Sequence, residues 1–307
     1  MNLKRCLSIL ATTFLFTASY TNAEPTDIPI VAKNNILHLT YVDTAGIGNR
    51  LKKTVSYLRY YTPKHLNIYW PSTGWVNARF TDLFAPEWET TITEYNSPYM
   101  IENFAYNQPL ANYVSEYTLL VAANEFKDNQ HRFIDLQYNH IPPEILKLYR
   151  PYFKALKPSP AVKKRIQEVT LPSNTVAVQI RNAPDWKRQF NTNEDIQNFF
   201  VEMDKFPPNT IFYLSAMSKE SAAPFYKRYP NRIIELPNKD YHSMVDATAD
   251  MYLLGATKTA IYQYGSTFAE VGWWLGGAKT QVIIIGNKLQ ENGPTLQMKV
   301  MDEFPKH

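Results

Sequence analysis

The hydrophobic pattern near the N-terminus predicts a strand, a helix and a second strand. An apolar run over residues 36–41 indicates a buried strand, and a polar stretch separates it from an amphipathic helix expected over residues 49–61. A second apolar run over residues 66–70 indicates the next strand. This order is the repeating unit of a parallel sheet. The apolar face of the helix is formed by Leu51, Val55 and Leu58.

From residue 174 onward the pattern becomes a regular alternation of strands and helices. Strands are expected over residues 175–181, 211–216, 232–236, 259–264 and 281–285, and helices over residues 193–205, 218–228, 243–255 and 266–275. Such alternation predicts a doubly wound α/β domain, in which ligands bind at the carboxyl ends of the strands.

The middle of the chain has less periodicity. Residues 71–135 are aromatic with few regular signals, although residues 117–123 resemble a strand. Helices are expected over 142–156 and 161–169, with the proline-containing stretch 157–160 between them. We place the domain junction there, which predicts two α/β domains over residues 24–157 and 158–307.

Residues 1–23 have the pattern of a secretory signal peptide. Lys4 and Arg5 precede an apolar stretch over residues 6–18, and small side chains near Ala23 suit cleavage before Glu24. The alternative is an uncleaved N-terminal anchor. Cleavage predicts a secreted or periplasmic protein and would remove the only cysteine, which excludes disulfides and thiolate metal sites from the mature chain.

Composition excludes several classes of protein. The chain has 307 residues, 45% of them hydrophobic and 20% charged, which is typical of a folded globular protein. A net charge of +4 is too small to indicate nucleic-acid binding. No apolar run after residue 23 reaches the about 18 residues that suggest a membrane span. The histidines and carboxylates show no ligand spacing and no Asp-x-Asp motif occurs, so we expect no metal site.

The first candidate motif lies where the first strand turns into the first helix. Gly46 and Gly48 permit close approach of the backbone, and Asn49 and Arg50 follow them directly. Asn49 suits a helix cap, and the free N–H groups of the first turn suit an anion. The alternative interpretation is a tight turn with a cap.

The second motif ends the strand over residues 175–181. Gln179 and Arg181 lie at its carboxyl end, followed by Asp185. The planar guanidinium of Arg181 suits a diphosphate. The alternative is an interdomain salt bridge.

The third motif combines a late acidic residue with a helix start. Asp250 lies on the helix over residues 243–255, and Ser266, Thr267 and Phe268 open the helix that follows the next strand. Hydroxyl and N–H groups at that start suit a phosphate. The alternatives are a plain N-cap at Ser266 and local pairing of Asp250.

Together, these motifs resemble those of the fucosyltransferase-like glycosyltransferases, the α1,2-, α1,6- and protein O-fucosyltransferases that use GDP-fucose. In that family a Gly-x-Gly-Asn-Arg/Gln loop, a His-x-Arg-x-x-Asp-like strand end, a late Asp and a Ser-Ser/Thr-Phe helix start occur in this order. The similarity covers roughly residues 36–70 and 175–285 and departs at Gln179, where the family usually has His.

The resemblance implies a GT-B fold, with two Rossmann-like domains facing across a cleft. Residues 24–157 would be the acceptor side and residues 158–307 the nucleotide-sugar side. It implies metal-independent, inverting transfer of a sugar, expected to be fucose, from a GDP-sugar to a hydroxyl of a glycan or protein, with no further cofactor. The donor would contact the residues of the three motifs, namely Gly46, Gly48, Asn49, Arg50, Gln179, Arg181, Asp250, Ser266, Thr267 and Phe268.

Three residues are the candidates for catalysis: Arg181 for charge on the departing diphosphate, Asn49 for the sugar or phosphate, and Asp185 as general base. Glu270 is a second candidate base. Trp70, Trp75 and the aromatic residues 95–117 are candidates for an acceptor surface, or for ordinary core packing. The rival hypothesis is a secreted sugar- or nucleotide-binding protein of the same fold without activity, which Gln179 and the signal peptide favour.

Overall fold

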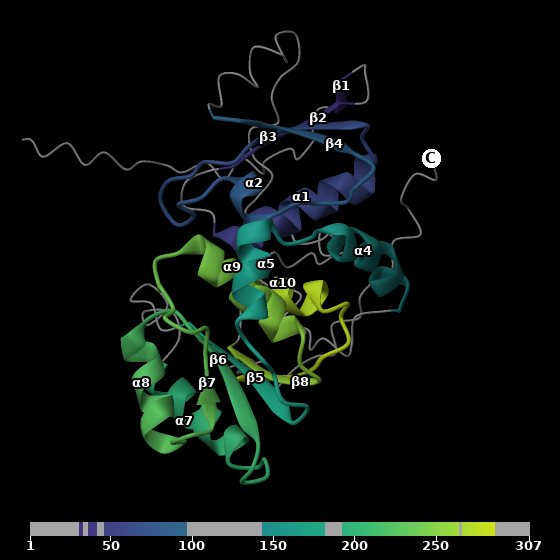
Figure 1. Ribbon diagram of the computed structural model, residues 1–307. Coiled ribbons are helices and arrows are strands. Elements are labelled where there is room, and N and C mark those ends of the chain that lie inside the picture. The colour runs from purple at the N-terminus through teal and green to yellow at the C-terminus, as the bar shows by residue number, and fades with distance from the viewer. Residues whose placement is uncertain are drawn as a thin grey trace, which may run out of the picture.

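The computed structural model describes residues 31–32, 36–41, 46–96, 143–181, 192–263 and 266–285. These residues form two sheets with a layer of helices between them (Figure 1). The predicted signal peptide over residues 1–23, the candidate strand over residues 117–123 and Asp185 lie outside the described residues.

The first sheet has the order β1-β2-β3-β4, in which β1 is antiparallel to β2 and the other neighbours are parallel. This sheet confirms the predicted strand-helix-strand unit. The sequence pattern did not predict β1, β4 or α2, because β1 and α2 are very short and β4 is only half buried. The elements are β1 (Val31–Ala32), β2 (Ile36–Thr40), α1 (Ile47–Tyr61), β3 (His65–Tyr69), α2 (Phe80–Leu83) and β4 (Thr91–Tyr95).

The second sheet has the order β7-β6-β5-β8-β9, and all its neighbours are parallel. Its five strands and the four helices among them confirm the predicted doubly wound order, with boundaries shifted by a residue or two at most ends. The elements are β5 (Thr175–Ile180), α7 (Thr192–Met203), β6 (Ile211–Ala216), α8 (Lys219–Arg228), β7 (Ile233–Ile234), α9 (Met244–Gly255), β8 (Thr259–Gln263), α10 (Thr267–Leu275) and β9 (Gln281–Ile285).

Every residue of β5 is buried, as expected for a central strand covered on both faces. The order of the strands reverses between β5 and β8, because β6 and β7 lie on one side of β5 and β8 and β9 on the other. In open parallel sheets such a switch point is where ligands bind. The residues that follow β5 and β8 are therefore the candidates for a binding site at this sheet.

Two helices lie at the predicted junction, α4 (Pro143–Ala155) and α5 (Pro160–Gln167). They confirm the helices expected over residues 142–156 and 161–169. Helix α4 packs against α1 and α10, whereas α5 packs mainly against α9. The boundary between residues 157 and 158 falls between α4 and α5, and its role as a domain boundary stays a prediction.

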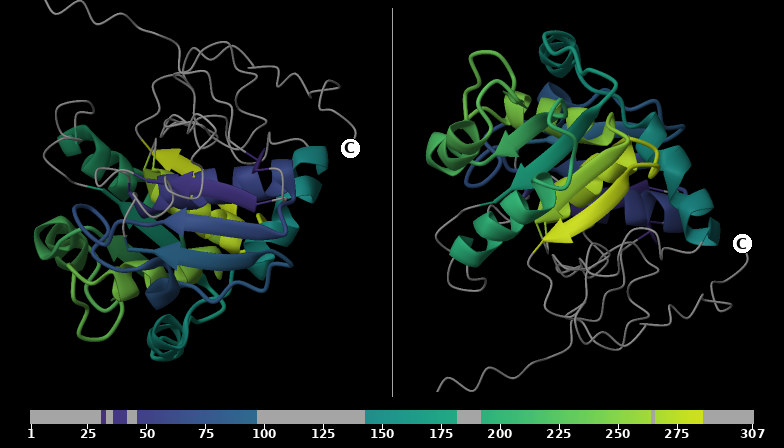
Figure 2. Two further views of the ribbon diagram at one scale, coloured as in Figure 1. Left: turned by 90° about the horizontal axis from the view of Figure 1, so that it is seen from above. Right: turned by 90° about the horizontal axis from the view of Figure 1, so that it is seen from below.

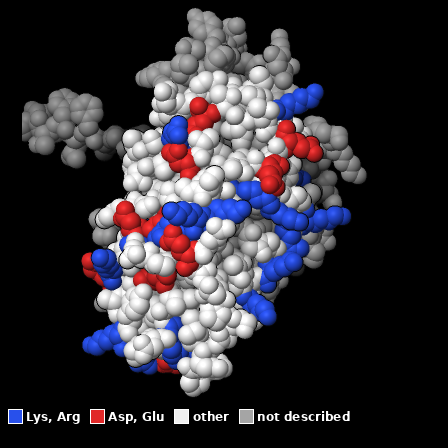
Figure 3. All heavy atoms as spheres, in the orientation of Figure 1, with Lys and Arg blue, Asp and Glu red and all other residues white. Residues whose placement is uncertain are grey.

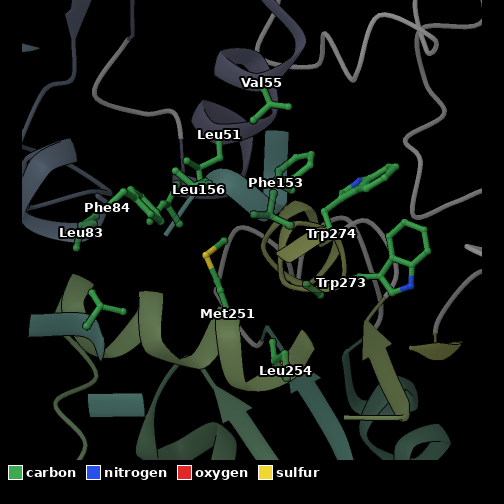
Figure 4. Close-up of a cluster of buried hydrophobic side chains, with 14 of the residues drawn as sticks. Leu51, Val55, Leu83, Phe84, Phe153, Leu156, Met251, Leu254, Trp273 and Trp274 are labelled. Atoms are coloured by element: carbon green, nitrogen blue, oxygen red, sulfur yellow. The ribbon is translucent and has the colours of Figure 1, made fainter. Parts of the chain in front are cut away.

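One apolar core extends through the helical layer between the sheets. Figure 2 shows the first sheet from above and the second from below. In Figure 4, Leu51 of α1, Phe153 of α4, Met251 of α9 and Trp274 of α10 lie around the same interior. A second core, which includes Val178, fills the space between the other face of the second sheet and helices α7 and α8. No described helix has both the length and the hydropathy needed to cross a bilayer.

Candidate functional site

The structure brings the first and third sequence motifs into direct backbone contact. Gly48 lies in the first turn of α1, against the residues that open α10. A Cβ atom built on Gly48 would lie 2.6 Å from the carbonyl carbon and oxygen of Thr267 and 2.8 Å from the amide nitrogen of Phe268. These atoms are backbone and cannot rotate away, so only glycine allows the two helix starts to meet.

The start of α1 has no side-chain cap. Gly46 is the N-cap, and the helix begins at Ile47, two residues earlier than predicted. The prediction that Asn49 caps this helix is therefore wrong, because Asn49 already lies inside the first turn. A Cβ atom on Gly46 would meet no atom of the described residues within 4 Å. The N–H groups of this turn are of the kind that binds an anion.

The start of α10 is capped by its own serine. The Oγ of Ser266 accepts a hydrogen bond from the amide of Ala269 at 3.3 Å, and Ser266 is buried. The N-cap interpretation of Ser266 is therefore confirmed, while direct contact of its hydroxyl with a phosphate stays a prediction. Thr267 and Phe268 are half buried, and their backbone atoms lie beside Gly48.

Arg181 lies at the switch point of the second sheet. Its backbone N–H donates to Oε1 of Gln263 at 2.5 Å, which joins the ends of β5 and β8. Its guanidinium lies 5.4 Å from the ring centroid of Trp75, which belongs to the connection between β3 and α2. The side chain thus reaches from one half of the molecule to the other. This is a cation–π contact with the first half of the molecule, and the interdomain salt bridge considered as the alternative stays untested.

The two tryptophans proposed for an acceptor surface have different environments in the structure. Trp75 is 45% exposed and lies beside Arg181, so it remains a candidate. Trp70 is only 2% exposed and packs edge-on against Tyr41 and Phe80, so it belongs to the core. The acceptor role of Trp70 is therefore wrong. Most of the aromatic stretch over residues 95–117 lies outside the described residues.

Gln179 is a buried residue with an unused acceptor. It is paired in register with Ser215 of β6 and Tyr262 of β8 and is 5% exposed. Its Oε1 accepts no hydrogen bond from the residues that the structure describes. Because a buried carbonyl without a partner is costly, this atom is suited to accept a hydrogen bond from a donor group that enters the site. Contact of Gln179 with a sugar donor stays a prediction.

Arg50 has a structural position that its sequence motif did not reveal. The residue is fully buried, its guanidinium lies 5.1 Å from the ring centroid of Trp70, and it donates to the carbonyl of Pro71 at 2.7 Å. It therefore holds the start of the connection that carries Trp75. Packing thus gives Arg50 a supporting role, and its predicted contact with the donor stays a prediction.

Asp250 is enclosed by side chains of its own chain. Its Oδ1 accepts from the hydroxyl of Tyr213 at 2.5 Å, and its Oδ2 accepts from Ser215 at 2.9 Å and from Nζ of Lys239 at 2.8 Å. Burial raises the pKa of Tyr213, and the charge of Asp250 raises it further, so the phenol stays a donor. These bonds confirm the alternative of local pairing. Guanine recognition by Asp250 stays a prediction, and a nucleobase would have to replace part of this network.

A buried ion pair that the sequence did not suggest lies one turn beyond the contact at Gly48. Nζ of Lys52 on α1 and Oε2 of Glu270 on α10 are 2.5 Å apart, with side chains 1% and 0% exposed. The indole N–H of Trp274 donates to the other oxygen of Glu270 at 3.4 Å. Glu270 is therefore not placed as a general base, because it is enclosed and engaged. The pair locks α1 against α10 beside the candidate site.

The arrangement suits an anion. It gathers one arginine and the starts of two helices, which present positive charge and N–H groups. The described residues hold no group of three His, Cys, Asp or Glu side chains arranged as metal ligands. Asp185, the remaining candidate base, lies outside the described residues.

Among the comparisons with known proteins, the one with solved structures finds a shared fold. No model of a protein family matches the sequence, and no curated protein matches it either. The structure is similar to that of POFUT1 in complex with GDP-fucose, with a TM-score of 0.50 and 10% identity over 84% of this chain and 99% of that chain. It is also similar to the fucosyltransferase NodZ from Bradyrhizobium, with a TM-score of 0.49 and 15% identity over 79% of this chain and 93% of that chain. The chain therefore has the GT-B-like fold of the fucosyltransferase-like glycosyltransferases.

Proposed function

We propose that this protein is a glycosyltransferase that moves fucose from GDP-fucose to a hydroxyl group of an acceptor, without a metal and with inversion at the sugar carbon. The observation that carries the proposal is the contact of Gly48 with Thr267 and Phe268. It unites two motifs that resemble the donor site of fucosyltransferases, and Arg181 lies at the switch point of the second sheet. The fold it shares with POFUT1 in complex with GDP-fucose supports the same reading.

The proposed chemistry is stabilisation of the leaving group. When the bond between sugar and phosphate breaks, negative charge develops on the departing GDP. The guanidinium of Arg181 and the N–H groups at the starts of α1 and α10 would bind that charge, in the place where other transferases use a metal. Asn49 would orient the sugar or the phosphate from the first half of the molecule.

The direct test is incubation of the purified mature chain with GDP-fucose and no acceptor. We expect slow release of GDP and free fucose, because such a site also activates the donor toward water. The matched control is UDP-galactose, from which we expect no release. Binding of GDP-fucose without turnover, in the absence and in the presence of candidate acceptors, would contradict a transferase.

Arg181→Lys is expected to weaken GDP binding about tenfold or more. A lysine keeps the charge but cannot form the two parallel N–H bonds of a guanidinium, and loss of a hydrogen bond to a charged group costs about 1.5–3 kcal/mol. Isothermal titration with GDP measures the effect. As a control, Arg228→Lys alters an exposed arginine that pairs with Asp204 and should bind GDP normally. Unchanged affinity of Arg181→Lys would place this residue outside the site.

Removal of divalent metals is expected to leave both GDP binding and turnover unchanged. The proposed site stabilises the leaving group with protein N–H groups alone. Turnover of GDP-fucose measured after dialysis against EDTA checks this expectation. Loss of activity with recovery on addition of Mn²⁺ would show that a metal takes part.

GDP is expected to raise the melting midpoint by several degrees and UDP by much less. A ligand at about 100 times its dissociation constant adds about 2.7 kcal/mol to stability, and in a chain of this size each kcal/mol shifts the midpoint by about 2–4 °C or somewhat less. Differential scanning fluorimetry at equal nucleotide concentrations measures both shifts. Equal shifts of the melting midpoint with GDP and with UDP would contradict the prediction that the protein recognises guanine.

The same measurement on Asp250→Ala tests the role of Asp250. We expect a lower basal melting midpoint, because Tyr213, Ser215 and the buried Lys239 lose a shared partner. If Asp250 also binds guanine, the GDP shift shrinks and the UDP shift does not. An unaltered preference for GDP would assign Asp250 to local pairing alone.

A second candidate function is binding of a sugar or nucleotide without catalysis. It is favoured by the neutral, buried amide of Gln179 at the position where the family usually has His. Gln179→His discriminates between the two functions. Appearance of turnover only in this variant would indicate a binding protein, whereas turnover in the unaltered chain indicates an enzyme.

We also propose that residues 1–23 direct export of the chain and are then removed. N-terminal sequencing of the mature protein tests this proposal.

A further inference from the structure

One segment of this protein carries a clear excess of positive charge. Residues 143–168 contain seven Lys or Arg and two Asp or Glu, whereas the whole chain has a net charge of +4. This segment therefore has a net charge of +5, which equals that of residues 50–64 with five Lys or Arg and no Asp or Glu. It comprises α4, α5 and the residues that connect them.

The charges of this segment lie on the surface. Lys147 and Lys154 of α4 and Lys163 and Lys164 of α5 are exposed, and none of the four forms an ion pair with any residue that the structure describes. Figure 3 shows Lys and Arg side chains in a band across this face of the molecule, over α5 and toward α4. We call these four residues the lysine band.

Other cations of the segment are already used. Arg165 pairs with Asp246 at 2.7 Å and Lys157 with Glu87 at 3.4 Å. The structure thus provides carboxylates for those two and leaves the lysine band without carboxylate partners among the described residues. An exposed set of like charges without carboxylate partners favours an external polyanion.

The side chains around the lysine band indicate the kind of polyanion. The large hydrophobic side chains that are exposed in the described residues are Trp75, Val201, Met217 and Tyr226, none of which belongs to α4 or α5. The band therefore lacks the aromatic platform on which single-stranded nucleic acids stack and the apolar anchors of a membrane-bound helix. The four cations of the band are lysines, which act as hydrated point charges rather than as a fixed fork for one anion. The remaining cation of the segment, Arg150, is half buried and donates to the carbonyl of Ala278.

We propose that the lysine band is a docking surface for an acidic polysaccharide, a linear polymer with a carboxylate or sulfate on many of its sugars. The choice of a sugar polymer rests on the proposed function, because a transferase needs an acceptor rich in hydroxyl groups. The polymer lies across α4 and α5 and is held by charge attraction, which keeps its hydroxyl groups near the protein without fixing one sugar in place. Binding is expected to weaken as salt rises, because the release of counterions into a more concentrated solution gains less entropy.

The test is binding of fluorescent alginate, a carboxylate-bearing polysaccharide, with neutral dextran and single-stranded DNA as further probes. We expect alginate to bind at about 50 mM salt and to bind much more weakly at about 200 mM. The variant changes all four residues of the lysine band to Gln and should weaken alginate binding about tenfold or more. The matched control changes the exposed Lys64, Lys205, Lys219 and Lys227 to Gln, with the same loss of charge, and should bind alginate normally.

Each outcome decides the proposal. Equal weakening by the control variant would show that only net charge matters and would overturn it, as would binding of dextran as strong as that of alginate. Tighter binding of single-stranded DNA, lost in the lysine-band variant, would assign the surface to nucleic acid instead. Alginate binding is measured without GDP-fucose, and the GDP shift of the melting midpoint is recorded on the same samples. A normal GDP shift with no alginate binding would therefore overturn this inference alone. Alginate binding with no GDP shift would overturn the proposed function alone.

Discussion

Lys52→Met is expected to lower the free energy of unfolding by about 3–5 kcal/mol, because it leaves a buried carboxylate without its cation. Lys52 and Glu270 are 2.5 Å apart and almost completely enclosed. Methionine has a similar length to lysine, so lost volume contributes little. Urea unfolding followed by tryptophan fluorescence measures the change.

Two further variants show the origin of this loss. Lys205→Met removes the partner of Glu202 in an ion pair whose lysine is 62% exposed, and should cost less than about 1 kcal/mol. The double variant Lys52→Met with Glu270→Leu should recover most of the stability, because an apolar pair can replace a buried ion pair of similar volume. If the double variant were less stable than Lys52→Met alone, the unpaired carboxylate would not be the cause.

Gly48→Ala is expected to destabilise the protein and to abolish GDP binding together. An alanine in a helix normally gains about 1 kcal/mol over glycine. Here the added methyl group would lie 2.6 Å from the backbone of Thr267, and overpacking of that kind costs about 1–3 kcal/mol or more. Since backbone atoms cannot turn aside, the start of α10 must move away from α1. Thermal unfolding and GDP titration measure the two effects.

Gly46→Ala provides the matched comparison two residues away. Gly46 has a φ of −67°, which alanine adopts freely, and its added methyl group meets no described atom within 4 Å. We expect a small loss of stability, below about 1 kcal/mol, since glycine is only somewhat better than alanine as an N-cap. GDP binding should still weaken, because the methyl group enters the space beside the N–H groups of α1. A melting midpoint as low as that of Gly48→Ala would contradict the steric explanation.

The amino-acid sequence by itself determined the second sheet and named the residues of its candidate site. The apolar runs of β5, β6, β8 and β9 and the periodic helices between them are local signals, and they predicted the alternation in full. The positions of Arg181 and Ser266 at strand and helix ends follow from the same pattern. Resemblance to a known family then added the fold and the donor class, which composition and periodicity did not contain.

Only the tertiary structure decided what each side chain touches. Lys52 and Glu270 are separated by 218 positions in sequence, and no local pattern pairs them. Arg50 follows Asn49 in the motif, yet packing buries its guanidinium against Trp70, and Asp250 lies among hydrogen-bond donors from β6 and from the residues before α9. The physical reason is that periodicity tells which face of an element is buried, whereas the partner on that face comes from whichever distant element packs against it.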